Sequence, residues 1–100
     1  MKFGELLEAI EGERYFLTKH AIERMVERIL SPPEVAEALR AGQVIERYPD
    51  DKYGPSSLVY GRTKNNRHLH LLISESDPVW VITVYDPDPK EWINFKARRR

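Results

Sequence analysis

The sequence predicts a single α+β domain, in which N-terminal helices pack on one face of a four-stranded antiparallel sheet and a short C-terminal segment follows. Apolar residues recur at helical spacing over residues 2–42, whereas residues 43–86 contain short runs rich in β-branched and aromatic residues. In addition, Asn65-Asn66 separates two of these runs, and such a pair is typical of the tight turn of a β-hairpin.

The first helix is expected over residues 2–11. Its apolar side chains follow helical spacing and form one stripe, made of Phe3, Leu6, Leu7 and Ile10. Gly12 ends this helix, because glycine is favoured just after a helix terminus. Residues 15–17 then form a short extended link to the next element.

A second helix begins after Thr18, whose hydroxyl can cap the first turn, and runs to about Leu30. Its expected buried stripe consists of Ile22, Met25, Val26 and Ile29.

The start of the third helix is the strongest local signal in the chain. In Ser31-Pro-Pro-Glu34, Ser31 caps the helix, Pro32 takes its first position and Glu34 completes a capping box. The helix is expected to bury Val35, Ala38 and Leu39, and to end at Gly42.

Four strands are expected in the second half of the chain, over residues 43–48, 57–64, 67–74 and 79–86. The polar segment 50–55 joins the first two strands, and the turn 75–78 joins the last two. Asp86-Pro-Asp-Pro89 breaks the fourth strand. A final short segment with Trp92, Ile93 and Phe95 is expected to dock back on the core.

The turn residues also predict the strand register. A two-residue turn at Asn65-Asn66 places Gly61 opposite His70, and a four-residue turn at 75–78 places Thr83 opposite His70. The expected core face carries Leu58, Tyr60, Leu69, Leu71, Ile73, Trp80, Ile82 and Val84. The expected opposite face carries Val59, Gly61, Thr63, His68, His70, Leu72, Val81, Thr83 and Tyr85.

This opposite face admits two interpretations. It could be a shallow polar site, in which His70 acts as general acid or base beside Thr83 and Tyr85 and Gly61 leaves space next to the imidazole. It could equally be a solvated face, since antiparallel sheets commonly leave one face in water. The pattern alone favours the solvated face.

His20, Arg24 and Arg28 are spaced four residues apart and therefore lie on one side of the second helix. An imidazole and two guanidiniums in a row could hold a phosphate and transfer a proton. They point away from the expected apolar stripe of their own helix, so periodicity alone favours an ordinary solvated surface.

No metal site or cofactor is expected. His68 and His70 alternate along one strand, as two zinc ligands would, but a site needs three or four ligands. The remaining histidine is His20 and the chain has no cysteine, so carboxylates would have to complete the set.

The composition limits the function classes. The chain has 100 residues and a formal net charge of zero, so no overall positive field indicates a nucleic-acid partner. Residues 1–95 are expected to form the domain, and residues 96–100 a basic tail that either frays or touches a phosphate or an acidic partner. No apolar run is long enough to span a membrane and no signal-peptide pattern is present, so a soluble cytoplasmic protein is expected.

A set of short motifs over residues 15–92 resembles a widespread family of small bacterial and archaeal domains of unknown function. The motifs are His20-Ala21, Arg24-Met25, Arg28, residues 31–35, Leu39, Gly42, Val44-Ile45-Glu46, Leu69-His70, Ile82-Thr83-Val84-Tyr85 and Trp92. The family is similar in layout to toxin domains of the barnase/EndoU/colicin/RelE group of metal-independent ribonucleases.

This resemblance implies a small endoribonuclease of toxin–antitoxin type, with RNA as substrate and an antitoxin-like protein as partner. His70 or His20 would be the base or acid, Arg24 and Arg28 would hold the scissile phosphate, and Tyr85 would stack a base or donate a proton. The neutral net charge departs from the basic character of such toxins. A non-catalytic protein- or RNA-binding module and a degenerate structural relative are therefore alternatives. The oligomeric state is not predicted.

Overall fold

Three helices precede the main run of strands in the computed structural model, which describes residues 2–100. They are α1 (Phe3–Glu11), α2 (Lys19–Arg28) and α3 (Pro32–Arg40). The predicted caps are confirmed. The Thr18 hydroxyl accepts a hydrogen bond from the Ala21 amide at 3.0 Å, and Ser31 and Glu34 form the reciprocal capping box of α3.

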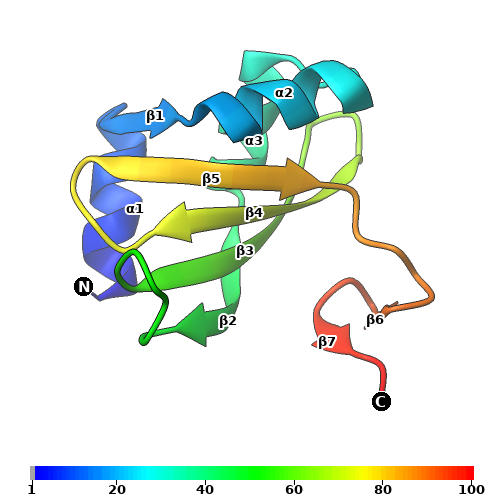
Figure 1. The fold of residues 1–100 in the computed structure, drawn as a ribbon. Coiled ribbons are helices and arrows are strands. Elements are labelled where there is room, and N and C mark those ends of the chain that lie inside the picture. The colour runs from blue at the N-terminus through cyan, green and yellow to red at the C-terminus, as the bar shows by residue number, and fades with distance from the viewer. Residues whose placement is uncertain (1) are drawn as a thin grey trace.

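Five strands form one mixed sheet in the order β1-β5-β4-β3-β2. They are β1 (Tyr15–Leu17), β2 (Gln43–Tyr48), β3 (Ser56–Arg62), β4 (His68–Ser74) and β5 (Val79–Tyr85). Two short strands, β6 (Trp92–Ile93) and β7 (Ala97–Arg98), form a separate C-terminal hairpin. Figure 1 shows α1 and α3 behind the sheet and this hairpin beside its lower edge.

The α+β class is confirmed, but the prediction of four antiparallel strands is wrong. The segment 15–17, expected to be a link, is β1, and it pairs in parallel with β5, Phe16 opposite Trp80. A three-residue strand carries almost no periodicity of its own, and here it forms because the neighbouring edge of β5 offers unpaired main-chain groups.

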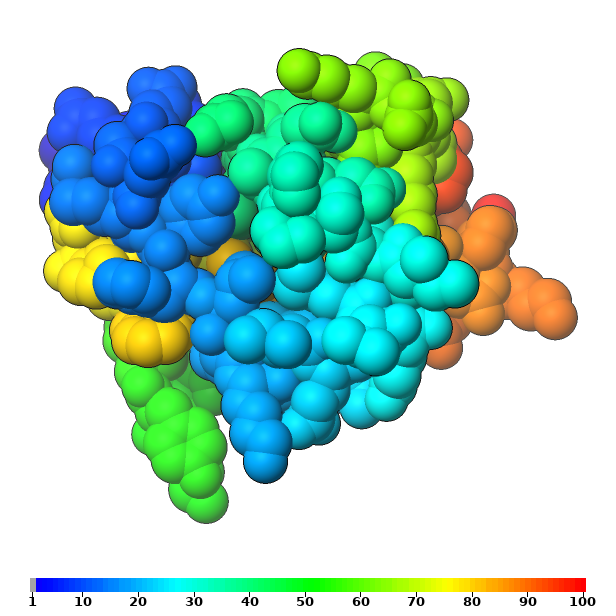
Figure 2. Space-filling view, turned by 90° about the horizontal axis from the view of Figure 1, so that it is seen from above, coloured from blue at the N-terminus to red at the C-terminus, as the bar shows by residue number. Residues whose placement is uncertain are grey.

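The helix α2 lies along the edge of the sheet and not over its face. Immediately after β1, the Thr18 amide donates to the Val81 carbonyl at 3.1 Å and the Thr18 hydroxyl donates to the Ile82 carbonyl at 2.8 Å. The helix then continues beside β5 (Figure 1). Figure 2 looks down on this edge, where α2 and α3 form one continuous surface and the segment after β5 projects at one end.

This position changes which side of α2 is buried. Ala21 and Met25 are buried, whereas Ile22, Val26 and Ile29 are 48%, 74% and 85% exposed. Of the predicted buried stripe, Met25 is buried as expected, but the prediction is wrong for Ile22, Val26 and Ile29. A narrow sheet edge contacts only a narrow strip of a helix, and this strip is the row that begins with the small Ala21.

The hairpin between β3 and β4 differs by one residue from the prediction. The Thr63 amide donates to the Arg67 carbonyl at 3.0 Å, and the Asn66 amide donates to the Thr63 carbonyl at 2.9 Å. Asn66 has a left-handed φ of 64°. The loop thus has three residues, a common hairpin form in which the third residue is left-handed. Tyr60 therefore pairs with His70, and Arg62 with His68.

One residue of slip moves every side chain of β3 to the other face of the sheet. Val59 faces the helices with Leu69 and Leu71, and Tyr60 joins His70 on the open face. The expected space beside His70 is absent, because Gly61 faces α3, where an added Cβ would lie 1.9 Å from the Ala38 carbonyl oxygen.

The pairing of β4 with β5 also differs from the prediction. Ile73 pairs with Val81, which is one residue away from the predicted register, and a bulge between Leu72 and Ile73 adds a second residue. Tyr85 therefore lies opposite His70, and Thr83 opposite Leu72. The open face therefore carries His70 and Tyr85 side by side, together with Leu72 and Thr83. No helix in the described part of the chain is both long and apolar enough to cross a membrane.

Candidate functional site

The C-terminal hairpin covers one end of the open sheet face. Trp92 of β6 is 3% exposed, and its ring meets the His70 ring edge-to-face at 4.5 Å. Phe95, in the turn of the hairpin, stacks on His68 at 3.8 Å. Docking of the segment around Trp92 and Phe95 therefore buries the middle of β4 from water.

His70 has no solvent exposure, and both of its ring nitrogens have partners. Nε2 lies 2.6 Å from the Phe95 carbonyl oxygen, and Nδ1 lies 3.1 Å from the Tyr85 hydroxyl. A carbonyl can only accept, so Nε2 carries the proton and Nδ1 accepts from Tyr85. Burial lowers the pKa of His70, and this effect is larger than the opposing effects of the Phe95 carbonyl and the Glu46 carboxylate, which raise it. His70 is therefore a neutral imidazole that orients Tyr85.

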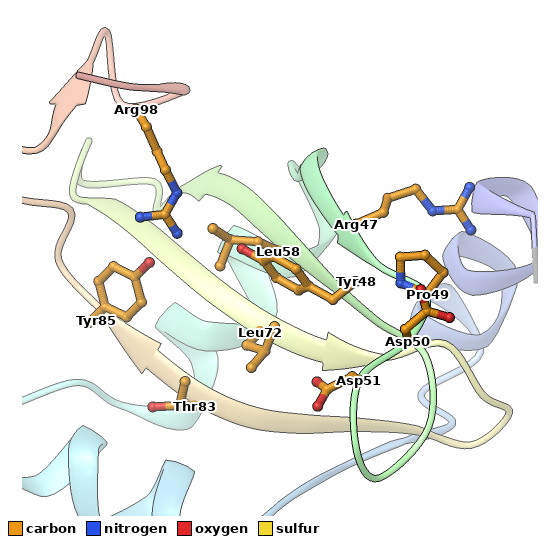
Figure 3. Close-up of a pocket in the computed structure, with 10 residues that line it drawn as sticks. All are labelled: Arg47, Tyr48, Pro49, Asp50, Asp51, Leu58, Leu72, Thr83, Tyr85 and Arg98. Carbon is orange, nitrogen blue, oxygen red and sulfur yellow. The ribbon is translucent and has the colours of Figure 1, made fainter. Parts of the chain in front are cut away.

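Beside the hairpin the open face forms a groove with a volume of about 710 Å³. Its lining consists of Arg47, Tyr48, Pro49, Asp50, Asp51, Leu58, Leu72, Thr83, Tyr85 and Arg98. Figure 3 shows the Arg98 guanidinium and the hydroxyl groups of Tyr48 and Tyr85 directed toward one another over an apolar floor, with Asp51 at the other end. The groove thus combines two guanidiniums, two phenols and two carboxylates with an apolar floor, which suits a ligand that has both polar and apolar surface.

Arg98 is held in place by a carboxylate. Its Nε donates to the two Glu46 oxygens at 2.9 and 3.2 Å, and its guanidinium lies 4.6 Å from the centre of the Trp92 ring. Tyr48 donates to the same carboxylate. Burial acts to raise the pKa of Glu46, but the hydrogen bonds from Arg98 and Tyr48 outweigh it and hold that pKa below its usual value. Glu46 is therefore ionised at neutral pH.

The two phenols of the groove keep their protons at neutral pH. Burial raises the pKa of Tyr85, and burial together with the Glu46 carboxylate raises the pKa of Tyr48. Each phenol already donates its one proton, Tyr48 to Glu46 and Tyr85 to His70, so either hydroxyl must turn from that partner to donate to an anion. Asp51, at the opposite end of the groove, accepts a hydrogen bond from Ser56 at 2.7 Å through one carboxylate oxygen.

The structure separates the residues that the sequence grouped. Thr83 and Tyr85 line the groove, and His70 lies behind Tyr85. The row of His20, Arg24 and Arg28 lies on α2 and does not line the groove. His20 is exposed. The two arginines that were expected to bind phosphate each form an ion pair, Arg24 with Glu27 at 2.8 Å and Arg28 with Asp86 at 3.6 Å. The Nε atom of each arginine is buried and has no hydrogen-bond partner.

Sequence reasoning gave no site role to Arg98 and Tyr48 of the groove lining, or to Glu46, which binds both of them. Arg98 belongs to the run that was expected to form a tail, but it lies in β7, opposite Trp92. The sequence does contain one indication of this cluster. Side chains alternate between the two faces of a strand, so Glu46 and Tyr48, two residues apart in β2, lie on the same face. That face becomes a site only because Arg98 reaches it from 52 residues away.

Within residues 2–100, no group of three or more acidic or histidine side chains lies close enough together to hold a metal ion. His68 and His70 lie on one face of β4, as predicted, but His68 uses Nδ1 to contact the Tyr60 hydroxyl at 2.7 Å, and both nitrogens of His70 are bonded.

Comparison with known proteins identifies a family but no characterised relative. No curated protein and no solved structure matches the chain. One family model, described as "Domain of unknown function (DUF4258)", matches residues 17–86, well over half of the chain. This confirms the expected relation to a small domain family of unknown function, and the chain belongs to the DUF4258 family.

Proposed function

We propose that the protein is a metal-independent endoribonuclease whose active site is the groove on the open sheet face. The observation that carries this proposal is the convergence of the Arg98 guanidinium with the Tyr85 hydroxyl over the groove. A guanidinium stabilises the charge that develops on a phosphoryl group, and a protonated phenol can supply a proton to the leaving oxygen.

The reaction needs no group that the chain lacks. Asp51 accepts the proton of the RNA 2′-hydroxyl, and the resulting 2′-oxygen attacks the adjacent phosphorus. The bond from phosphorus to the 5′-oxygen breaks, and Tyr85 turns its O–H from His70 to that oxygen and protonates it. The products are a 2′,3′-cyclic phosphate and a 5′-hydroxyl end. In Figure 3 Asp51 and Tyr85 lie at opposite ends of the groove, so the proposal requires the scissile phosphate to lie between them.

His70 is a positioning residue in this proposal. Its neutral ring holds the Tyr85 hydroxyl and takes no part in the proton transfers. His20, Arg24 and Arg28 are proposed as flanking contacts. They lie on α2, which borders β5, the strand that supplies Thr83 and Tyr85 (Figure 1). An RNA strand that leaves the groove across β5 reaches this helix, where the two guanidiniums can contact neighbouring phosphates.

The test is incubation of the purified chain with single-stranded RNA in EDTA, followed by analysis of the new ends. Cleavage that leaves cyclic phosphate ends is the expected result. Arg98→Gln should slow cleavage by about 10²–10³-fold, the effect of losing one preorganised oxyanion contact. Tyr85→Phe and Asp51→Asn should each slow it by about 10²-fold or more. Arg100→Gln, a cation outside the groove lining, is the matched control.

Two results would exclude this function. RNA that stays intact but binds to the chain in a manner sensitive to Arg98→Gln indicates a non-catalytic RNA-binding module. Intact RNA without binding indicates a degenerate relative with a structural role. If the chain does cleave RNA, a small protein that covers the groove is the antitoxin-like partner that this activity implies, and its addition should stop cleavage.

A further inference from the structure

A second cavity lies at the other side of the C-terminal hairpin, between its turn and the strands β3 and β4. Its volume is about 580 Å³, which is within the range of small-ligand sites. The side chains that give it chemical character are Gln43, Tyr60, Arg62, His68, Phe95 and Lys96. It shares Tyr60 and His68 with the open sheet face, so it continues the face that carries the groove.

Three aromatic rings of this cavity are almost parallel. Phe95 stacks on His68 with 3.8 Å between ring centres and 7° between planes. Tyr60 lies 5.9 Å from each of them, at 10° to His68 and 8° to Phe95. All three side chains are partly exposed. Parallel, partly exposed rings of this kind form a surface on which a flat base can stack.

Phe95 occupies a backbone conformation that phenylalanine rarely adopts. The turn Ile93–Lys96 is closed by a 3.0 Å hydrogen bond from the Lys96 amide to the Ile93 carbonyl. Its central residues Asn94 and Phe95 have φ values of 51° and 64°. Such a turn favours Asn-Gly, and a bulky side chain there is disfavoured. Strained residues of this kind concentrate at functional sites, where surrounding contacts hold them in place. Here the buried His70 binds the Phe95 carbonyl.

The charge around the cavity differs from that of the whole chain. The chain has a net charge of zero, but the cavity lining contains Arg62 and Lys96 and no carboxylate. Lys96 also lies 5.8 Å from the centre of the Tyr60 ring. The side-chain amides of Gln43 and Asn94 complete the rim, and both residues are exposed. An amide can donate to and accept from the edge of a base, so it can distinguish one base from another.

We infer that this cavity binds a base of single-stranded RNA next to the phosphate held in the groove. The base stacks on the surface formed by Phe95, His68 and Tyr60, the amide of Gln43 contacts its edge, and Arg62 and Lys96 contact the adjoining phosphate. This inference rests on the proposed function, because it makes the cavity a base-selecting subsite of the same nuclease. It adds a preference for the nucleotide that flanks the cleaved bond.

The test uses Phe95→Gly, which removes the ring and creates the Asn-Gly pair that the turn favours, so the fold should be retained. Binding is measured with a 2′-O-methyl RNA oligonucleotide, which cannot be cleaved. Phe95→Gly should weaken binding by about 5- to 100-fold, the usual loss for one stacked base. Tyr53→Ser removes a ring that is 90% exposed and outside the cavity, and should leave binding unchanged. Wild-type affinity in Phe95→Gly would overturn the inference.

A second measurement separates this inference from the proposed function. Cleavable RNAs that differ in the base beside the cut are compared for wild type and Gln43→Ala, a variant of an exposed side chain that should fold normally. Altered base preference supports the subsite. Cleavage with the same base preference in both Gln43→Ala and Phe95→Gly overturns the subsite and leaves the nuclease intact. If the wild-type chain cleaves no RNA but Phe95→Gly loses oligonucleotide binding, the subsite is supported and the nuclease function is excluded.

Discussion

The Nε2 atom of His70 lies 2.6 Å from the carbonyl oxygen of Phe95, and this contact joins the middle of β4 to the turn of the C-terminal hairpin. The same ring accepts a hydrogen bond from Tyr85 and is covered by Trp92. One buried side chain therefore fixes both the hairpin and the phenol that faces the groove. The stability of the fold and the geometry of the candidate site depend on the same residue.

His70→Leu should destabilise the protein by about 2–4 kcal/mol. Leucine fills a similar volume, but the Phe95 carbonyl and the Tyr85 hydroxyl lose a partner in a buried position. Urea denaturation followed by circular dichroism measures the change. His20→Gln is the control, because His20 is exposed and its replacement should stay within about 0.5 kcal/mol. A His70→Leu variant as stable as this control would show that the hairpin docks through its apolar contacts alone.

Stability should fall as the pH is lowered through the range in which unfolded histidine titrates. Burial lowers the pKa of His70 in the folded protein, and burial with nearby Arg62 lowers that of His68. Between the folded and unfolded pKa values the unfolded chain binds more protons, so stability is complete above about pH 6.5 and decreases below it. The slope is at most about 1.4 kcal/mol per pH unit for each histidine, and smaller for the partly exposed His68.

Urea midpoints at pH 7.5, 6.5 and 5.5 measure this dependence. His70→Gln should flatten the curve in this range, and His68→Gln should flatten it less. The carboxylates of Glu46 and Asp86, whose pKa values are lowered by their arginine partners, lose their contribution only at more acid pH, so they do not obscure the test. A curve that is unchanged in His70→Gln would mean that His70 titrates alike in the folded and unfolded states.

The starts of two helices could be predicted because their signals are local. The Thr18 hydroxyl accepts from the amide of Ala21, three residues later, and the Ser31 hydroxyl accepts from the amide of Glu34, also three residues later. The strand β1 could not be predicted in the same way. It has three residues, and its pairing partner Val79 lies 64 positions after Tyr15. A strand that exists through one distant neighbour has no periodicity to detect.

The side chains of β3 were assigned to the wrong faces of the sheet because the predicted hairpin loop was one residue too short. Two- and three-residue hairpin loops both accept asparagine at their left-handed positions, so the sequence around Asn65-Asn66 fits either. The choice decides whether Tyr60 or Val59 faces the helices. The contact between Arg98 and Glu46 could not be predicted for a similar reason. It joins residues far apart in the sequence and forms only because the C-terminal hairpin folds back over β4. Tyr85, by contrast, lies in a strand that the sequence predicts and lines the groove.

Gly61→Ala should be strongly destabilising, by about 2 kcal/mol or more. An added Cβ would lie 1.9 Å from the Ala38 carbonyl oxygen, which belongs to the backbone of α3 and cannot move without shifting the helix. Gly4→Ala is the matched control. Gly4 lies in the first half of α1 with nothing within 4 Å of an added Cβ, and alanine there should stabilise by about 0.4–1 kcal/mol. Thermal unfolding of both variants measures the difference, and equal melting temperatures would contradict the close seating of α3 on β3.

Arg67 connects the end of α2 to the end of β5. Its guanidinium donates to the Arg28 carbonyl at 2.8 Å and the Ile29 carbonyl at 3.2 Å, which are free acceptors at a helix C-terminus. It also binds both oxygens of Asp86, at 2.8 and 2.9 Å. Four contacts from one planar group require an arginine, because an ammonium cannot reach them together.

Arg67→Lys should therefore destabilise the protein by about 1–2 kcal/mol although the charge is kept, since the helix carbonyls and one carboxylate oxygen lose their donor. Arg40→Lys is the control, because Arg40 faces an exposed Glu13 oxygen at 3.7 Å and should change stability by less than about 0.5 kcal/mol. Urea unfolding measures both. Hydrogen exchange adds a local measurement, in which the last turn of α2 should exchange faster in Arg67→Lys. Equal stability of the two variants would mean that charge alone, and not the forked geometry, holds α2 against the sheet edge.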